Sequence, residues 1–200
     1  QTINTYQEES LEYIRQTQHL KSFPHIKVLL DEFCKHLPHF GSVLDIACGS
    51  GRDSIYFLDR GYHCISVDIT PAFVHHCAKI HQNVVQADIH NMPFRENTYN
   101  GIWICSTIVH VDSCFLRDVI RSCMNLIKDD GLIYFDFKDG QGASQRSYVK
   151  GKRTFYYHDT QLIDTLLRSL GLVCIYQSSH QNTIHSGIWH QYIVKKAIES

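Results

Sequence analysis

The fold of this chain is decided by one stretch, Ser42-Val43-Leu44-Asp45-Ile46-Ala47-Cys48-Gly49-Ser50-Gly51-Arg52-Asp53. Its apolar beginning predicts a short buried strand, its two glycines predict a tight turn, and the residues that follow predict a helix that ends before Gly61. Because a glycine has no side chain, the backbone of such a turn can approach a ligand closely. A strand, a glycine turn and a helix in this order predict a site for a nucleotide-like ligand.

The composition is that of an ordinary globular protein. The chain has 200 residues, of which 44% are hydrophobic, and we expect one domain over residues 1–200. Its net charge of -1 provides no overall basic field for nonspecific nucleic-acid binding. No apolar run approaches the ~20 residues needed to cross a bilayer, and the polar first residues do not resemble a signal peptide. We therefore expect a cytoplasmic protein, monomeric or homodimeric, with no membrane partner.

The cysteines and histidines raise the question of a metal site. None of the 8 cysteines falls in a Cys-x-x-Cys spacing, and most lie in apolar patterns, so we interpret them as reduced core thiols. The densest group of histidines is His75-His76-Cys77 with His81. A structural zinc site needs four ligands, and no second ligand pair stands at a suitable spacing, so we expect no metal.

Short apolar strands and amphipathic helices alternate after the opening unit. The strands are expected at residues 64–68, 83–88, 101–106 and 132–137. This alternation predicts parallel strands joined by right-handed crossovers, which is a doubly wound α/β sheet. Two closing strands, at residues 172–176 and 188–194, fit an antiparallel hairpin.

Two flanking regions differ from this pattern. Residues 1–40 predict an N-terminal helical lid, and residues 139–157 predict an exposed loop on the substrate side that is rich in glycine, serine and basic residues. The basic side chains Arg146, Lys150, Lys152 and Arg153 favour an anionic substrate or an RNA backbone, although a solvated loop explains them as well.

The acidic residues around the turn narrow the choice of ligand. A dinucleotide-binding turn has a third glycine or alanine where this chain has Ser54, and an acid about 20 residues on, where Asp68 follows Gly49 by 19 residues. Asp45, on the strand before the turn, would repel a pyrophosphate and favour a cationic ligand.

These residues resemble the class I S-adenosylmethionine-dependent methyltransferases, over nearly the whole chain. The run from Asp45 to Gly51 is similar to the family's first motif, Asp/Glu-x-Gly-x-Gly-x-Gly, with Ala47 in place of the first glycine. The resemblance implies a Rossmann-like, seven-stranded, mostly parallel sheet of order 3-2-1-4-5-7-6 with helices on both faces. It also implies S-adenosylmethionine as the cofactor.

Finer matches concern subgroups of this family. The segment Gly51-Arg52-Asp53-Ser54 is similar to small bacterial enzymes of the tellurite-resistance and ubiquinone-biosynthesis types, and Arg153-x-Phe155-x-Tyr157 is similar to methyltransferases that complete wobble-uridine modifications in tRNA.

The resemblance implies roles for individual residues. Asp68 matches the acid that takes the ribose hydroxyls, and Asp88 with Ile89 matches the motif at the adenine ring. Cys105 and Ser106 stand where the fourth strand lines the cofactor. The full set of expected cofactor-binding residues is Tyr13, Asp45, Ala47, Gly49, Gly51, Asp53, Asp68, Ile69, Asp88, Ile89, Cys105 and Ser106.

Methyl transfer from a sulfonium is an in-line displacement, so alignment and desolvation can supply most of the catalysis. If a general base is used, His110 is the first candidate, because it follows the fourth strand and titrates near neutral pH. The expected substrate-side residues are Tyr6, Thr107, Ile108, Lys138, Arg153, Tyr157, His185 and Trp189. We expect a small-molecule acceptor; an RNA methyltransferase and a noncatalytic binding module remain the alternatives.

Overall fold

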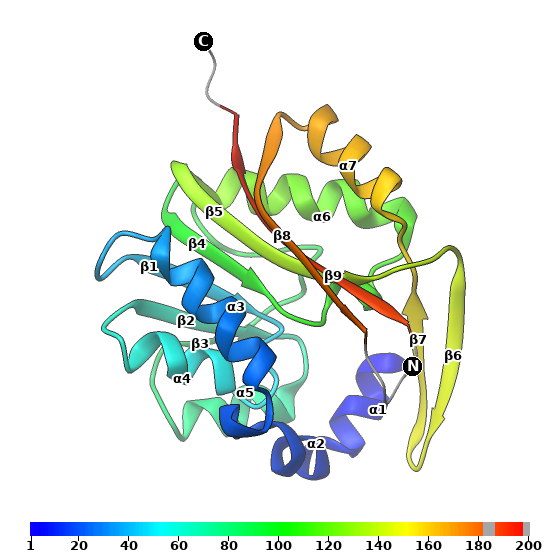
Figure 1. The fold of residues 1–200 in the computed structure, drawn as a ribbon. Coiled ribbons are helices and arrows are strands. Elements are labelled where there is room, and N and C mark those ends of the chain that lie inside the picture. Colours follow the sequence, from blue (N-terminus) through cyan, green and yellow to red (C-terminus); the bar gives the residue numbers. More distant parts are fainter. Residues whose placement is uncertain (182–186, 198–200) are drawn as a thin grey trace.

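The computed structural model describes residues 1–181 and 187–197, and a seven-stranded sheet of order β3-β2-β1-β4-β5-β9-β8 forms its centre (Figure 1). The strands of this sheet are β1 (Ser42–Ile46), β2 (His63–Asp68), β3 (Val84–Gln86), β4 (Tyr99–Ile104), β5 (Ile127–Lys138), β8 (Leu172–Gln181) and β9 (Ile188–Lys196). The first five are mutually parallel, whereas β9 runs antiparallel to both β5 and β8. The predicted doubly wound sheet and its order are confirmed, since β8 and β9 are its sixth and seventh strands.

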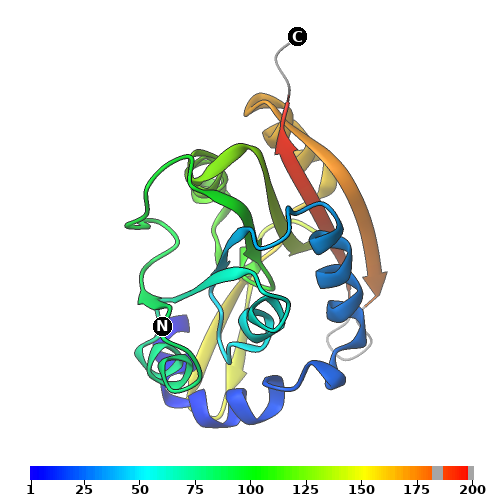
Figure 2. The same ribbon diagram turned by 90° about the vertical axis from the view of Figure 1, so that its left-hand side faces the viewer.

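Helices cover both faces of the sheet, as Figures 1 and 2 show. Helices α3 (Pro24–Lys35) and α4 (Arg52–Leu58) pack on one face, and α6 (Ser113–Leu126) and α7 (Thr160–Ser169) on the other. Helix α5 (Pro71–Ala78) lies beside β2 and β3. The remaining helical segments are α1 (Thr2–Glu8), α2 (Ser10–Thr17) and the short 3-10 turns η1 (Leu20–Ser22) and η2 (Ile108–His110).

The two-residue period of the strands sorts their side chains between these layers. On β4, Ile102 and Ile104 join the core beneath α6 and α7, while Trp103 joins the core beneath α3 and α4. The Trp103 ring stacks on the Tyr134 ring with 3.7 Å between their centroids. The centroid of the Phe33 ring, on α3, lies 5.4 Å from that of Trp103. An aromatic cluster therefore fixes α3 to the middle of the sheet.

Side-chain caps begin the two helices of the other face. The Asp112 carboxylate accepts a hydrogen bond from the N–H of Cys114 at 3.0 Å, and that of Asp159 accepts from the N–H of Leu162 at 2.7 Å. Helix α6 ends at Leu126, and β5 begins at Ile127.

The stretch 139–157 is not the exposed loop that the sequence predicts. Most of it is a hairpin of β6 (Ala143–Tyr148) and β7 (Gly151–Tyr156), and β7 lies beside α1 (Figure 1). The Thr5 hydroxyl donates to the carbonyl of Lys152 at 2.9 Å, and the Thr154 N–H donates to Thr2 Oγ1 at 3.0 Å. These contacts are polar and join distant parts of the chain, so hydrophobic periodicity gives no signal for them.

No helix in the described ranges is long and apolar enough to cross a membrane.

The aromatic cluster gives a prediction for stability. Phe33→Ala should lower the free energy of unfolding by about 3–5 kcal/mol, because the ring is fully buried against Trp103, Phe57 and Tyr134. Val28→Ala, on the exposed side of the same helix, should change it by less than about 0.5 kcal/mol. Urea unfolding measures both, and a similar loss for the two variants would contradict this packing of α3.

Candidate cofactor and substrate site

The turn after β1 has a backbone conformation that depends on its glycines. Ala47, Gly49 and Gly51 have positive φ angles of 58°, 53° and 74°. A Cβ on Gly49 would lie 3.1 Å from the Tyr13 ring, and one on Gly51 would lie 2.9 Å from Cys77 Sγ. Ala47 adopts the left-handed conformation with a side chain, which costs about 1–2 kcal/mol.

The Asp68 carboxylate, 5% exposed at the end of β2, holds this turn in place. Its Oδ2 accepts from the N–H of Gly49 at 2.9 Å, and its Oδ1 accepts from the N–H of Thr70 at 2.8 Å. Burial raises the pKa of Asp68, and these two N–H groups oppose that shift. The Thr70 hydroxyl and the N–H of Ile69 also interact with this carboxylate, so a ligand hydroxyl would share its acceptor sites with these groups.

A first cavity of about 200 Å³ opens at the carboxyl ends of β1, β2 and β4. Nine of the twelve expected cofactor-binding residues line it: Tyr13, Ala47, Gly49, Asp68, Ile69, Asp88, Ile89, Cys105 and Ser106. Tyr6, Thr107 and His110, predicted for catalysis or substrate binding, line it too. The lining residues that the sequence did not indicate are Thr2, Ile3, Ile46, Thr70, Phe73, Ala87, His90 and Val111.

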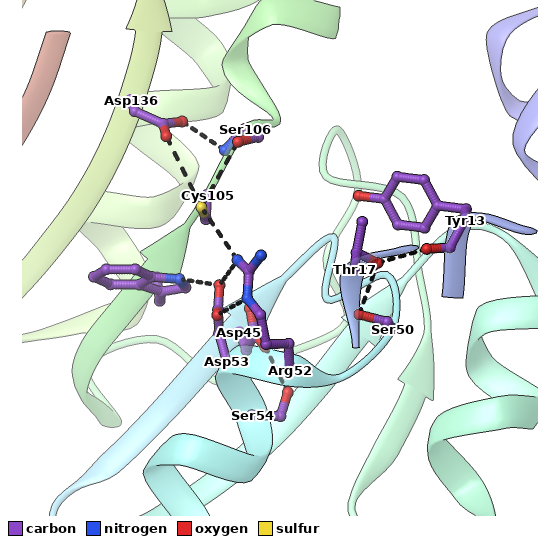
Figure 3. Close-up of polar contacts among 11 residues, drawn as sticks. Tyr13, Thr17, Asp45, Ser50, Arg52, Asp53, Ser54, Cys105, Ser106 and Asp136 are labelled. Carbon is purple, nitrogen blue, oxygen red and sulfur yellow. Dashed lines mark hydrogen bonds and ion pairs between the residues drawn. The ribbon is translucent and has the colours of Figure 1, made fainter. Parts of the chain in front are cut away.

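Aromatic rings from the N-terminal helices form one wall of the first cavity. The Tyr6 ring lies 5.4 Å from that of Tyr13 and 6.1 Å from that of Phe73, centroid to centroid. Helix α2 is tied to the glycine turn by the Thr17 hydroxyl, which donates to Ser50 Oγ at 3.0 Å (Figure 3). The predicted N-terminal lid thus reaches the cavity, although the sequence gives no signal for Phe73, which α5 brings there.

His110 has both ring nitrogens in hydrogen bonds. Its Nδ1 lies 2.7 Å from the carbonyl oxygen of Thr154, which can only accept, so Nδ1 carries the proton. Burial lowers the pKa of His110, and in the neutral ring Nε2 then accepts from the Tyr6 hydroxyl at 3.1 Å. No lone pair of this imidazole is available to a ligand while the Tyr6 contact is made.

A second cavity, of about 310 Å³, adjoins the first and shares Tyr13, Ala47, Cys105 and Ser106 with it. Three carboxyl groups and one guanidinium, those of Asp45, Asp53, Asp136 and Arg52, belong to its lining. Its rings come from Phe23, His25, His180 and Trp189 in addition to Tyr13. Of the residues predicted from the sequence, Asp45, Asp53 and Trp189 lie here and not in the first cavity.

Arg52 and Asp53 form a two-pronged ion pair in the second cavity (Figure 3). Arg52 Nε lies 2.6 Å from Asp53 Oδ1, and Nη2 lies 2.9 Å from Oδ2. The indole N–H of Trp103 also donates to Asp53 Oδ2 at 3.0 Å, which connects the ion pair to the aromatic core.

Asp45 differs from the charged group expected from the sequence. The Ser54 hydroxyl donates to its Oδ2 at 2.5 Å, and only 2% of the residue is exposed. Burial and the nearby Asp53 carboxylate raise the pKa of Asp45 to about 8. The raised pKa favours the uncharged form near neutral pH, so the structure does not support the expectation that a negative charge on Asp45 selects a cationic ligand.

Asp136, which is not among the residues predicted from the sequence, lies near the end of β5. Its Oδ1 accepts from the N–H of Ser106 at 2.5 Å, and burial raises its pKa to about 7. The sequence does contain a signal for Asp136, because it is an acid near the end of a predicted strand, as Asp68 and Asp88 are.

The remaining predicted residues lie away from both linings. Ile108 is fully buried and lines neither cavity, because it packs in the apolar cluster beneath α6. Gly51 begins α4 and faces Cys77. Lys138, Arg153 and Tyr157 line neither cavity, and His185 lies outside the described residues.

Arg153 has a structural role in place of the predicted contact with substrate. It is 8% exposed, its Nη2 lies 2.8 Å from Glu9 Oε2, and its guanidinium stacks 3.9 Å from the centroid of the Tyr6 ring. The side chain thus links β7 to the N-terminal helices. Within the ranges described, no three His, Cys, Asp or Glu side chains are grouped to hold a metal ion.

The raised pKa of Asp45 predicts a pH dependence of stability. Between about pH 4 and pH 8 the folded protein holds a proton that the unfolded chain has lost, so this group's contribution to stability falls as pH rises. Asp45→Asn removes the effect, and its free energy of unfolding relative to the wild type should increase from pH 5 to pH 8, by at most about 1.4 kcal/mol per pH unit.

Urea unfolding at pH 5, 6, 7 and 8 measures this difference. Asp118→Asn, at an exposed position on α6, is the matched control and should follow the wild type at every pH. An equal difference between Asp45→Asn and the wild type at pH 5 and pH 8 would contradict the protonated state.

Comparisons with known proteins agree with this geometry. Residues 43–131 match the family model of a methyltransferase domain. A malonyl-[acyl-carrier protein] O-methyltransferase from Enterobacter lignolyticus (strain SCF1) is 26% identical over 109 residues, which are 52% of this chain and 43% of that enzyme. The chain thus matches less than half the length of this curated relative.

Solved structures share the fold over most of the chain. A protein from Pyrococcus horikoshii OT3 has a TM-score of 0.74 at 17% identity, covering 92% of this chain and 93% of its own. The 1,6-didemethyltoxoflavin-N1-methyltransferase of Burkholderia thailandensis, solved with 1,6-didemethyltoxoflavin and S-adenosylhomocysteine, has a TM-score of 0.73 at 14% identity, covering 97% and 88%. Residues 43–131 are thus similar to a methyltransferase domain, and the sheet order and the glycine turn agree with the expected resemblance to the class I S-adenosylmethionine-dependent methyltransferases.

Proposed function

We propose that this protein transfers a methyl group from S-adenosylmethionine to a small-molecule acceptor. The observation that carries the proposal is the first cavity, in which the glycine turn, Asp68 and Asp88 meet at the ends of three neighbouring parallel strands. Ligands of open α/β sheets bind at this edge, beside the strand where the order reverses.

The residues of the first cavity fit the methyl donor. Asp68 and Asp88 offer buried or half-buried carboxylate oxygens that can accept from ribose hydroxyls and from an exocyclic amine. Ile69 and Ile89 offer apolar surface for a flat ring, and the rings of Tyr6 and Tyr13 suit a cationic centre. When bound, the cofactor supplies a methyl group activated by a sulfonium.

The packing of the basic side chains near the site supports a small acceptor. Arg153, one of the basic residues that could contact an RNA backbone, is buried against Glu9 and Tyr6, and Arg146 lies 4.8 Å from the centre of the Phe155 ring. The Burkholderia relative holds a small heterocycle, whereas the Enterobacter relative is named for a substrate on an acyl-carrier protein. We favour the first of these two kinds of acceptor.

Catalysis by this protein rests mainly on alignment and exclusion of water. His110 is hydrogen-bonded to Tyr6 of α1 and to Thr154 of β7, so its ring fastens these two segments over the first cavity. We therefore assign His110 a positioning role, and a general-base role requires the Tyr6 hydroxyl to leave Nε2.

Binding of S-adenosylhomocysteine tests the cofactor site. Asp88→Ala removes a half-buried carboxylate whose Oδ1 accepts from the N–H of His90 at 2.9 Å. We expect affinity to fall about 10-fold or more, because a hydrogen bond to a charged group contributes about 1.5–3 kcal/mol. Asp68→Asn should weaken binding comparably.

Isothermal titration calorimetry measures these affinities, with Asp118→Ala as the control that should bind like the wild type. Thermal unfolding of each variant separates loss of binding from loss of fold. Absence of binding by the wild-type protein, or full affinity in Asp88→Ala, would contradict the proposed function.

Transfer of labelled methyl groups tests the acceptor class. The wild-type protein, given radiolabelled S-adenosylmethionine and a bacterial lysate, should label the small-molecule fraction more than the protein or RNA fractions. His110→Ala should slow labelling at saturating cofactor by less than the 10²–10⁴-fold typical of a lost general base. Label confined to RNA or protein would overturn the proposed acceptor, and a larger loss in His110→Ala would restore the general-base role.

A further inference from the structure

The second cavity is placed where a methyl acceptor would meet the cofactor. Its wall is continuous with that of the first cavity through Ala47, Cys105, Ser106 and the Tyr13 ring. Because the two linings share these residues, a molecule in the second cavity would lie next to one in the first. This inference rests on the proposed function and concerns the molecule that receives the methyl group.

The charges of the second cavity disfavour an anionic occupant. The lining contains three carboxyl groups and one guanidinium, that of Arg52. This guanidinium already makes two hydrogen bonds to the Asp53 carboxylate. A carboxylate or phosphate entering the cavity would find no unpaired Lys or Arg side chain among the described lining residues to neutralise it. A neutral molecule that donates hydrogen bonds is favoured.

Asp136 has one oxygen that is only weakly engaged. Its Oδ1 accepts the Ser106 N–H at 2.5 Å, but the contacts of Oδ2 are the Tyr134 hydroxyl at 3.4 Å and Cys105 Sγ at 3.9 Å. Figure 3 shows Asp136, Cys105 and Arg52 converging on one region. Because Asp136 is 3% exposed, a donor that reached Oδ2 would form a hydrogen bond sheltered from water.

The rings of the second cavity favour a flat occupant. The His25 and His180 rings have their centroids 5.0 Å apart, and Phe23 and Trp189 belong to the same lining. The indole N–H of Trp189 is buried and has no hydrogen-bond partner among the described residues. An occupant with an acceptor atom can satisfy this donor, which is otherwise costly to bury.

We propose that the second cavity binds the methyl acceptor, that this acceptor is a planar, uncharged nitrogen heterocycle, and that Asp136 selects it by accepting its N–H. A ring nitrogen that carries no hydrogen would accept the hydrogen bond from the Trp189 indole N–H. Asp136 is thus the specificity-determining residue of the acceptor site.

Three probes of similar size test this proposal on the full chain saturated with S-adenosylhomocysteine. Benzimidazole has both an N–H and a bare ring nitrogen, benzoxazole has the same shape with oxygen in place of the N–H, and benzoate is an anion. Calorimetry should show benzimidazole binding about 10-fold or more tightly than either of the others.

Variants assign this preference to the second cavity. Asp136→Asn keeps the oxygen that accepts from Ser106, so it should bind S-adenosylhomocysteine and benzoxazole within about twofold of the wild type and benzimidazole about 10-fold more weakly. Trp189→Phe keeps a ring but loses the N–H, and should weaken benzimidazole by a smaller factor. Asp129→Asn makes the same change at an exposed position of the same strand and should leave the affinities for all of these ligands unchanged.

The outcomes separate this inference from the proposed function. Binding of S-adenosylhomocysteine without any preference for benzimidazole overturns the inference alone, as does a preference that survives in Asp136→Asn or tighter binding of benzoate. If Asp136→Asn does not fold, unchanged benzimidazole binding in Trp189→Phe has the same meaning. Failure of the wild type to bind S-adenosylhomocysteine overturns the proposed function itself.

Discussion

Two hydrogen bonds to one buried carboxylate hold the functional part of this structure together. Asp68, at the end of β2, accepts from the backbone of Gly49 in the turn after β1 and from that of Thr70 at the start of α5. The turn contains three residues with positive φ, a conformation that its own sequence only partly favours, since Ala47 has a side chain. The carboxylate offsets that cost and fixes the floor on which the Tyr13 ring and the N-terminal helices rest.

Buried acids beside this turn impose a second constraint. Asp45, Asp53 and Asp136 lie around a single guanidinium, and only Asp53 is paired with it. The raised pKa values of Asp45 and Asp136 show how the protein accommodates the other two, because a protonated carboxyl can be buried at much lower cost than a carboxylate. The site therefore contains groups that change charge near neutral pH at the place where two cavities meet.

The sequence predicts the sheet well because strands and helices follow local patterns. The strand order, the glycine turn and the lining by Asp68, Asp88, Cys105 and Ser106 all follow from short segments with clear periodicity or a recognisable motif. Features that depend on pairing across the fold were missed: the β6–β7 hairpin has mainly polar contacts with α1, and the burial of Arg153 against Glu9 has no sign in either segment. The charge state of Asp45 also depends on Asp53 and burial, which a motif does not encode.

The contact between α1 and β7 has a consequence for the order in which the molecule is assembled. Thr5 is hydrogen-bonded to a residue 147 positions further along the chain, and Glu9 to one 144 positions further. During synthesis from the N-terminus, the first two helices emerge long before the hairpin that fastens them, and they are too short to be stable as isolated helices. The parallel strands of the central sheet can pair earlier, so the pocket gains its floor first and its cover last. A nascent chain that has reached β5 already contains the residues of the cofactor floor but cannot yet close over a ligand.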